Sequence, residues 1–332
     1  MKLRSNQRLH KPLFYARGFL EHHVIPDCLF RERLGKKLEA LNPENQARIL
    51  DRVRYYNKFD SLAPIPESAV RLSQLKPTSK TAYYYDLRQV LRYFPRTLKV
   101  ATRFGDVRDV SDFPRIVKTR PIQGSNENSI LLKLNSVRHF RPCTDNAPYA
   151  HKIDGIVWRG KVNKDHRQTI FQQHFGNPLC NLGKTNDLNE GENPAWKTPW
   201  MSIEEQLRYK FILSIEGNEV ATNLKWIAQS NSLCFMTKPK FESWFMEGRL
   251  EASKHYVELR DDYSDLPEKM DYYLAHPDEA REIIANLNAY YAQFTNSDEE
   301  LLISLLVVEK YLVSTGQREA QPRHSILPKD QP

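Results

Sequence analysis

The chain has 332 residues, of which 40% are hydrophobic and 27% are charged, and its formal net charge is +8. A chain of this kind buries a sizeable core and is long enough for two domains, so we expect a soluble globular protein. Its four cysteines lie far apart without a Cys-x-x-Cys pair, which argues against a zinc knuckle or a small disulfide framework. The positive charge favours anionic partners, whether nucleic acid, lipid headgroups or nucleotide phosphates.

The apolar runs are too short for a membrane protein. The longest, residues 301–308, is well below the ~20 residues that a membrane-spanning helix needs. No secretory hydrophobic region follows the first ten residues. We therefore expect a cytoplasmic protein.

The first third of the chain is predicted to be helical at first and then extended. Leucines recur at helical spacing in residues 28–57, where Asn42-Pro43 interrupts the pattern, so we expect a helical hairpin there. A helix over residues 84–95 is expected next, followed by a strand over 97–107 that ends in polar residues. Residues 115–122 are a second candidate strand.

The rest of the chain alternates between extended and helical patterns. After a loop over residues 142–152, the apolar run "GIVWRG" is expected to be the first strand of a second domain. Alternation of this kind predicts a parallel sheet covered by helices. The expected helices are 165–176, 202–210 and 220–231, the expected strands 178–183, 211–217, 232–236 and 255–259, and the terminal helices 266–295 and 298–316, which Asn296 and Ser297 separate as caps.

The common catalytic motifs are absent. The "GKT" at 183–185 has Pro178 where a phosphate-binding loop needs glycine, and the sequence contains no Gly-x-Gly-x-x-Gly, Gly-x-Ser-x-Gly or His-Glu-x-x-His. It also contains no Asp-x-Asp, the pair with which many sugar-nucleotide enzymes hold a divalent metal on the donor diphosphate. A sugar-nucleotide enzyme with this sequence would use cationic side chains instead.

Three predicted strand ends carry such residues. Ligands of open parallel sheets bind beyond the carboxyl ends of the strands, so the residues there are candidates for a site. The three ends together place two carboxylates, an arginine and a lysine, which is the set expected around a sugar nucleotide. The first end has Asp106 after Gly105, the second has Arg159 and Lys161 around Gly160, and the third has Glu216, Gly217 and Asn218.

Several blocks occur in order between residues 85 and 295. They are "RFGDV", "IVKTRPI", "LLKLNSVRHF", "IVWRGK" and the long run from "KFILSIEGNEVATNLKW" through "HYVELRDDYSDLPEKM". Together they resemble glycosyltransferase family 90. The resemblance is closer to its bacterial lipopolysaccharide core branch than to the eukaryotic protein O-glucosyltransferases. One departure is Asn223, where eukaryotic members tend to have an arginine. Such a departure affects substrate details more than the reaction class.

The resemblance implies an α/β protein of the GT-B type, with two Rossmann-like domains facing across a cleft and extra N-terminal helices. The expected ranges are 1–65 for a helical segment, 66–152 for the acceptor-side domain, 153–295 for the donor-binding domain, and 296–332 for a C-terminal helix and loose tail. The implied reaction is a metal-independent, inverting transfer of glucose or galactose from a UDP-sugar to a sugar hydroxyl of the lipopolysaccharide or lipooligosaccharide core. No cofactor or metal is expected.

Each candidate residue receives a role from this reaction. Asp106 matches the family's Gly-Asp, where the general base lies, although Asp109 and Asp112 compete for the assignment. The transition state carries positive charge on the sugar and negative charge on the departing diphosphate, which Arg159 and Lys225 are expected to meet. Glu216 is expected to bind hydroxyls, and the amides after Gly217 are expected to form a helix N-terminus facing the donor. Asn231 and Ser232 are expected to bind uridine or ribose. The remaining donor-side candidates are Gly160, Lys161, Asn218 and Asn223.

Purely structural roles are the alternatives for these residues. Asp106 can be a turn residue, Lys225 can lie along a helix surface, and Glu216 can cap one. Lys118 and Arg120 face either the acceptor or water.

At the level of the whole protein, the alternatives are a UDP-sugar-dependent protein O-glycosyltransferase, a non-catalytic carbohydrate- or nucleotide-binding relative, and a nucleic-acid-binding protein, which no recognition motif supports. The expected partners are a UDP-sugar, a core acceptor and an anionic membrane surface, reached from the cytoplasm at the inner face of the inner membrane.

Overall fold

The structure, a computed structural model, describes residues 2–38 and 41–319 and divides into two compact units. Its mixture of helices and parallel strands confirms the expected α/β class. The chain leaves unit 1 and returns to it twice, so both chain ends belong to unit 1. Unit 1 consists of Met1–Arg138, Lys240–Met246 and Phe294–Pro332, and unit 2 of His139–Pro239 and Glu247–Gln293. The four predicted domain ranges stay predictions.

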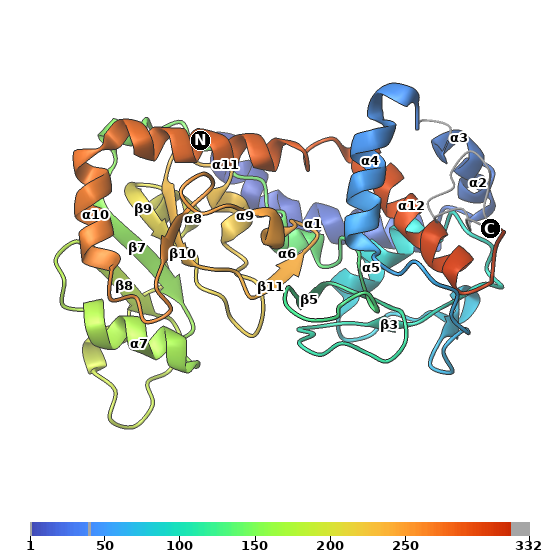
Figure 1. The fold of residues 1–332 in the computed structure, drawn as a ribbon, viewed down its shortest axis with the longest axis horizontal. Helices are drawn as coiled ribbons and strands as arrows, with labels where there is room; N and C mark the ends of the chain where they lie inside the picture. The colour runs from blue at the N-terminus through green and yellow to red at the C-terminus, as the bar shows by residue number, and fades with distance from the viewer. Residues whose placement is uncertain (1, 39–40, 320–332) are drawn as a thin grey trace. The chain divides into compact units, whose positions relative to one another are not determined.

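Unit 2 is built on a five-stranded sheet in which every pair of neighbours is parallel (Figure 1). The expectation of a parallel sheet in this part of the chain is therefore confirmed. The strands in spatial order are β12 (Val257–Leu259), β10 (Leu233–Thr237), β9 (Tyr209–Leu213), β7 (Ile153–Gly160) and β8 (Cys180–Lys184).

Both faces of this sheet are buried, as parallel sheets require. On one face, Trp158 and Phe211 join a core with residues of α7, α10 and α11. Residues of the opposite face, such as Val157 and Ile212, are also fully buried. Because successive residues of a strand point to opposite faces, the near-continuous apolar run of β7 serves both cores.

The helices of unit 2 differ in part from expectation. Residues 220–231, expected as one helix, contain only the single turn α9, and β9 ends at Leu213 rather than at residue 217. The elements are α6 (Ser136–His139, at the unit boundary), α7 (Asp165–His174), α8 (Ile203–Gln206), α9 (Leu224–Ile227), α10 (Leu266–Ala275), α11 (Pro277–Ala292), and the 3-10 turns η2 (Tyr149–His151), η3 (Pro194–Trp196) and η4 (Glu247–Arg249).

Unit 1 contains only short strands. The predicted strand 115–122 divides at Lys118, where the chain passes from one sheet to another, and the predicted strand 97–107 divides into β2 and β3. A parallel sheet has β4 (Arg115–Val117) between β3 (Thr102–Arg103) and β6 (Ser129–Leu131), β5 (Thr119–Pro121) pairs antiparallel with β11 (Phe241–Ser243), and β1 (Val70–Arg71) pairs antiparallel with β2 (Lys99–Val100).

Helices make up most of unit 1. Asn42 caps α4 and Pro43 is its first residue, as expected for the second half of the predicted hairpin, but the first half is broken into α2 and α3. Asn296 caps α12, also as expected. Helix α1 lies within the range 1–65, for which the resemblance implied a helical segment, but no individual helix was predicted before residue 28. The elements are α1 (Lys2–His23), α2 (Cys28–Arg31), α3 (Leu34–Leu38), α4 (Pro43–Tyr56), η1 (Leu72–Gln74), α5 (Thr81–Leu91) and α12 (Ser297–Ser314). Among the described residues, none of the helices has the length and apolar character of a bilayer-crossing segment.

An ion pair lies in the interior of unit 1 where β5 meets β11. Arg120 is fully buried and its Nε donates to Glu242 at 2.7 Å, while its terminal nitrogens donate to the carbonyl oxygens of Tyr55, Tyr56 and Ser129. The expectation that Arg120 faces the acceptor or water is therefore corrected, because its guanidinium is enclosed by protein acceptors. Removal of one member of such a pair leaves a buried charge uncompensated.

We predict that Glu242→Gln destabilises the protein by roughly 3–5 kcal/mol, because the Arg120 guanidinium then stays buried without its counter-charge. The midpoint and slope of urea unfolding measure this effect. The matched control is Glu251→Gln, which removes an exposed pair with Lys254 and should leave the urea midpoint nearly unchanged. Equal effects of the two substitutions would contradict the assignment.

Candidate functional site

The loops that follow β7, β9 and β10 meet at the carboxyl edge of the unit 2 sheet, where ligands of such sheets bind. A small pocket opens there between the loops after β9 and β10. It is lined by Ser214, Glu216, Val220, Ala221, Leu224, Met236, Thr237, Pro239 and Glu247. The sequence prediction that Glu216 follows the carboxyl end of a strand agrees with this position, three residues beyond Leu213.

The loop from Ser214 to Asn223 is closed by its own side chains. Asn223 Nδ2 donates to the Leu213 carbonyl at 2.7 Å, and Ser214 Oγ donates to Asn223 Oδ1 at 3.3 Å. These bonds satisfy groups that a continued strand or helix would have used, which explains why β9 stops early and α9 is short. The predicted helix N-terminus after Gly217 is therefore replaced by a closed turn.

Arg167, on the first turn of α7, holds this loop from the other side. Its Nε donates to the Glu216 carbonyl at 2.9 Å and Nη2 to the Ile215 carbonyl at 3.0 Å, while Nη1 donates to the Lys161 carbonyl at 2.8 Å. The guanidinium also lies over the Trp158 ring at 5.3 Å. One side chain thus joins the loops that follow two neighbouring strands.

Arg167 and its neighbour His166 are residues that the sequence reasoning missed. His166 Nε2 lies 2.9 Å from the Glu216 carbonyl. The residues predicted for the donor side close a strand or lie in residues 216–232, whereas these two lie on the helix after β7. Their position on the first turn of a helix that follows a candidate strand was the available signal.

Lys225, the predicted diphosphate cation, lies in the interior beside the pocket. Its side chain is fully buried, Nζ forms an ion pair with the Glu247 carboxylate, and the Ala221 carbonyl is 3.4 Å away. Glu247 is 2% exposed and lines the pocket. The pair therefore connects α9 to η4 directly behind the loop that carries Glu216.

Arg159 lies against β8. Its Nη1 and Nη2 donate to the main-chain and side-chain oxygens of Asn181 at 2.8 and 2.7 Å, and its Nε is buried without a hydrogen-bond partner among the described residues. Burial lowers the pKa of the Arg159 guanidinium. Gly183 makes room for this side chain, because a Cβ there would lie 2.6 Å from Arg159 Cδ. The guanidinium lies beside Asn181, which pairs with Val157 in the sheet, three residues before β7 ends at Gly160.

The other donor-side candidates fall into two groups. Gly160 ends β7, and Lys161, Gly217 and Asn218 follow strands at the same carboxyl edge, with Lys161 and Asn218 exposed. Asn231 and Ser232 instead precede β10, and because β9 and β10 are parallel, they lie at the opposite edge of the sheet. Asn231 binds the Asp145 and Ala147 carbonyls, and Ser232 Oγ donates to the Tyr209 carbonyl at 2.8 Å. The sheet therefore separates this pair from Glu216.

In unit 1, Asp106 follows Gly105, whose φ of +110° favours glycine. The Asp106 side chain is 39% exposed, and its Oδ1 lies 3.3 Å from Nζ of Lys118, which is itself 2% exposed. Lys118 therefore contacts the predicted base from the interior. An exposed carboxylate held by a buried ammonium has the accessibility that a general base requires.

The two competing aspartates have different surroundings. Asp109 pairs with Arg115 at 2.7 Å and Arg103 at 2.9 Å, and the hydrogen bond from Arg115 lowers the pKa of Asp109. A carboxylate that two guanidinium groups hold is a weaker proton acceptor. Asp112 is exposed.

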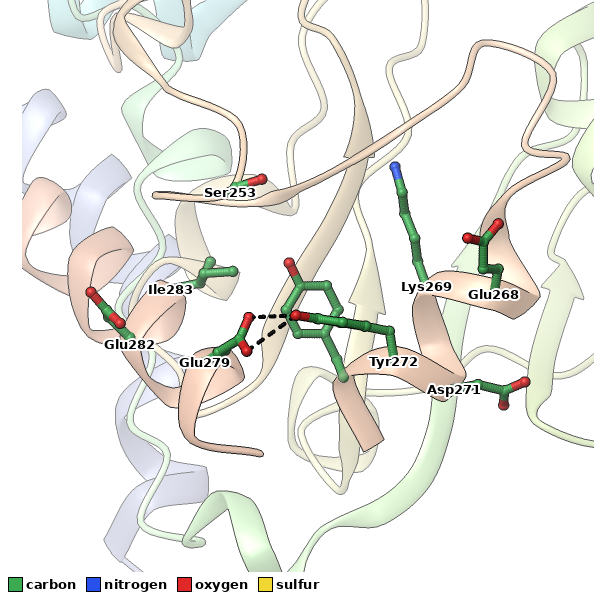
Figure 2. Close-up of a pocket in the computed structure, with 9 residues that line it drawn as sticks. Ser253, Glu268, Lys269, Asp271, Tyr272, Glu279, Glu282 and Ile283 are labelled. Atoms are coloured by element: carbon green, nitrogen blue, oxygen red, sulfur yellow. Dashed lines mark hydrogen bonds between the residues drawn. The ribbon is translucent and has the colours of Figure 1, made fainter. Parts of the chain in front are cut away.

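A larger cavity of about 690 Å³ lies elsewhere in unit 2, beside α10 and α11 (Figure 2). The Tyr272 hydroxyl donates to Glu279 across this cavity at 2.9 Å. Four carboxylates and one lysine line it, so its charge disfavours a diphosphate. The described lining residues, which include none of the predicted site residues, are Ser253, Glu268, Lys269, Asp271, Tyr272, Tyr273, Glu279, Glu282 and Ile283.

Comparison with known proteins identifies the family. The family described as Glycosyl transferase family 90 matches residues 132–306. O-glucosyltransferase LpsA of Dichelobacter nodosus is 39% identical over 311 residues, which cover 93% of this chain and 97% of the relative. The chain belongs to glycosyltransferase family 90. The resemblance seen in the sequence is thereby confirmed, and the protein is a glycosyltransferase.

More distant members of family 90 match only part of the chain. The human Protein O-glucosyltransferase 3 is 27% identical over 139 residues, or 41% of this chain and 27% of the human protein. Protein O-glucosyltransferase 2 of Danio rerio is 25% identical over 139 residues. The bacterial relative is the one in this group that matches along nearly the whole chain.

We predict that Arg167→Gln weakens binding of UDP about tenfold, because the loop that carries Glu216 loses donors to two of its carbonyl groups. Isothermal titration calorimetry with UDP measures this change. Arg281→Gln is the matched control, since Arg281 makes an exposed pair with Asp278 on α11 and should leave binding unchanged. Unaltered UDP binding in Arg167→Gln would refute the role of this loop.

Proposed function

We propose that this family 90 enzyme transfers glucose from UDP-glucose to a hydroxyl of a lipopolysaccharide or lipooligosaccharide core sugar, with inversion and without a metal. The observation that carries the proposal is the 39% identity to an O-glucosyltransferase along 93% of the chain. Glucose is preferred to galactose for this reason. The acceptor class rests on the resemblance of the sequence blocks to the bacterial branch of the family.

In the proposed reaction, Asp106 accepts the proton of the acceptor hydroxyl as its oxygen forms a bond to the anomeric carbon. The bond between that carbon and the diphosphate oxygen breaks on the opposite face, and UDP leaves with the electron pair. A single base suffices, because the diphosphate is a good leaving group once its charge is stabilised. Asp106 lies 3.3 Å from Lys118, whereas Asp109 pairs with two guanidinium groups at 2.9 and 2.7 Å, and this difference supports the selection of Asp106 over Asp109.

The donor is proposed to bind at the carboxyl edge of the unit 2 sheet. Glu216 accepts hydrogen bonds from hydroxyl groups of the donor, and the main chain of Gly217 and Asn218 lies beside it. Lys161 is exposed at this edge and supplies positive charge. Arg159 and Lys225 bind Asn181 and Glu247 in the structure, so their proposed contact with the diphosphate requires an exchange of partners.

Asn223 is assigned a supporting role, since its side chain closes the loop through the Leu213 carbonyl. Asn231 and Ser232 are left out of the proposed site because they lie at the other edge of the sheet. The GT-B arrangement is part of the proposal: a base from one Rossmann-like domain and the donor loops of another act on the same sugar.

The proposed partners are a UDP-sugar, the core acceptor and an anionic membrane surface, where a lipid-linked acceptor is found. A protein acceptor is the alternative, and the partial match to a human protein O-glucosyltransferase is the observation in its favour. Transfer assays with core oligosaccharide and with folded protein acceptors distinguish the two.

We predict that Asp106→Asn lowers kcat roughly 10²- to 10⁴-fold while UDP binding is unchanged, because an amide does not accept the hydroxyl proton. Release of UDP from UDP-glucose in the presence of core oligosaccharide measures kcat. The anomeric configuration of the product, read by NMR, should be opposite to that of the donor.

Asp112→Asn is the matched control, since Asp112 is an exposed aspartate six residues away and should retain activity. Full activity of Asp106→Asn, or loss confined to Asp112→Asn, would remove Asp106 from its role. A retained anomeric configuration would contradict the single-base mechanism.

A further inference from the structure

Helix α1 packs on α5 with one side only. Phe14 and Tyr15 contact the ring of Tyr85 edge-on, with centroid distances of 6.4 and 6.1 Å. Gly18 lies so close to the same ring that a Cβ there would be 2.7 Å from it. These contacts determine which side of α1 packs on α5, and the opposite side is turned to solvent.

The opposite side of α1 is apolar and exposed. Leu13, Leu20 and Val24 are 62%, 52% and 63% exposed. Their spacings of seven and four residues place them along one stripe of the helix and its last turn. We call these three residues the α1 apolar face. The chain beyond it continues the exposure, with Ile25 at 37% and Leu29 at 44%. Soluble proteins rarely expose a contiguous apolar surface of this kind without a partner.

The same part of the chain holds most of the net positive charge. Residues 1–38 contain nine Lys and Arg residues against three Asp and Glu residues, a net charge of +6 of the chain's +8. On the α1 apolar face itself, the Arg17 side chain is 67% exposed between Leu13 and Leu20. Net charge is therefore concentrated in the segment that contains α1, because the other 294 residues carry 40 Lys and Arg against 38 Asp and Glu, a net charge of +2.

We propose that the α1 apolar face inserts into the headgroup region of a bilayer that contains anionic phospholipids, with the surrounding lysines and arginines against the phosphates. An apolar stripe within a basic segment has the composition of helices that lie in the membrane interface. A second copy of this chain would bring a segment of the same positive charge, so charge complementarity favours the lipid. The inference rests on the proposed function only for the reason why a membrane is approached, namely a lipid-linked acceptor.

Sedimentation with vesicles tests the proposal. Full-length protein should bind vesicles of phosphatidylcholine and phosphatidylglycerol, bind phosphatidylcholine alone much more weakly, and dissociate as salt is raised. Leu13→Asp combined with Leu20→Asp should reduce the partition coefficient tenfold or more, since two apolar side chains no longer insert. The matched control is Leu62→Asp combined with Ile65→Asp, which changes two exposed apolar residues of unit 1 and the same charge, and should bind as wild type does.

Cys28 offers a direct probe of depth. It is exposed and lies between Ile25 and Leu29, whereas Cys180 and Cys234 are buried. Burial raises the pKa of the Cys143 and Cys180 thiols to about 12, so a thiol-reactive fluorophore should label Cys28 selectively at neutral pH. The emission of the label should shift to the blue with anionic vesicles and be quenched by a lipid-borne quencher.

Two results would overturn the proposal. One is equal binding of wild type and the Leu13/Leu20 variant to anionic vesicles. The other is a change of oligomeric state in that variant, seen by light scattering, with no vesicle binding by wild type. UDP release with soluble, lipid-free core oligosaccharide separates this inference from the enzymatic function: the variant should keep wild-type turnover there. Turnover by wild type without vesicle binding would refute only the membrane proposal. Vesicle binding without turnover would refute only the enzymatic proposal.

Discussion

The contacts of Arg167 with three main-chain carbonyl groups are the interaction on which the candidate donor site depends. The carbonyls belong to Ile215, Glu216 and Lys161, so one guanidinium links the loops that follow β9 and β7. A planar group with five donors suits this task, and its position over the Trp158 ring limits its motion. A Cβ on Gly217 would lie 3.3 Å from Arg167 Nη2, so a larger residue there would press on this guanidinium. The place of Glu216 at the carboxyl edge follows from these contacts.

Buried ion pairs support the same edge and the interior of unit 1. Lys225 with Glu247, Lys184 with Glu192, and Arg120 with Glu242 all join a fully buried cation to a carboxylate. The desolvation of both charges offsets most of their attraction, so such pairs add little net stability, but the loss of one member is costly. They therefore determine which conformations of the loops are permitted. In the proposed function, a diphosphate that enters the site competes with Glu247 for a charge that is already in place.

Much of unit 2 could be predicted from the sequence, because its regularities are local. Apolar runs such as that of β7, separated by helical patterns, require crossovers and hence a parallel sheet. The break at Asn42-Pro43 and the cap at Asn296 could be predicted because both depend only on the residues next to them in the chain. The end of β9 was not predicted, since the Asn223 side chain closes its loop through a hydrogen bond to Leu213 that helix propensity does not report. Helix α1 was not predicted as an individual helix within the expected helical segment 1–65, because its packing partner, Tyr85, is remote in sequence.

The candidate site was harder to predict than the fold. Lys225 and Arg120 were selected as free cations, but their partners lie 22 and 122 residues away in the sequence, and nothing local announces them. Asn231 and Ser232, which precede the next strand, were predicted to bind the uridine or ribose of the same nucleotide as Glu216. Because β9 and β10 are parallel, residues that precede β10 lie at the edge where β9 begins, opposite to Glu216. Asp106 was selected from the Gly-Asp that follows a predicted strand and matches the family, and its role as the base stays a prediction.

The central claim is that the donor nucleotide binds at the carboxyl edge of the unit 2 sheet, on the loops that Arg167 joins. Hydrogen exchange of the backbone amides with and without UDP, followed by mass spectrometry, tests it most directly. The account predicts that UDP slows exchange in residues 161–167 and 214–223. Protection confined to residues 229–233, or to the acidic cavity beside α10 and α11, would contradict it.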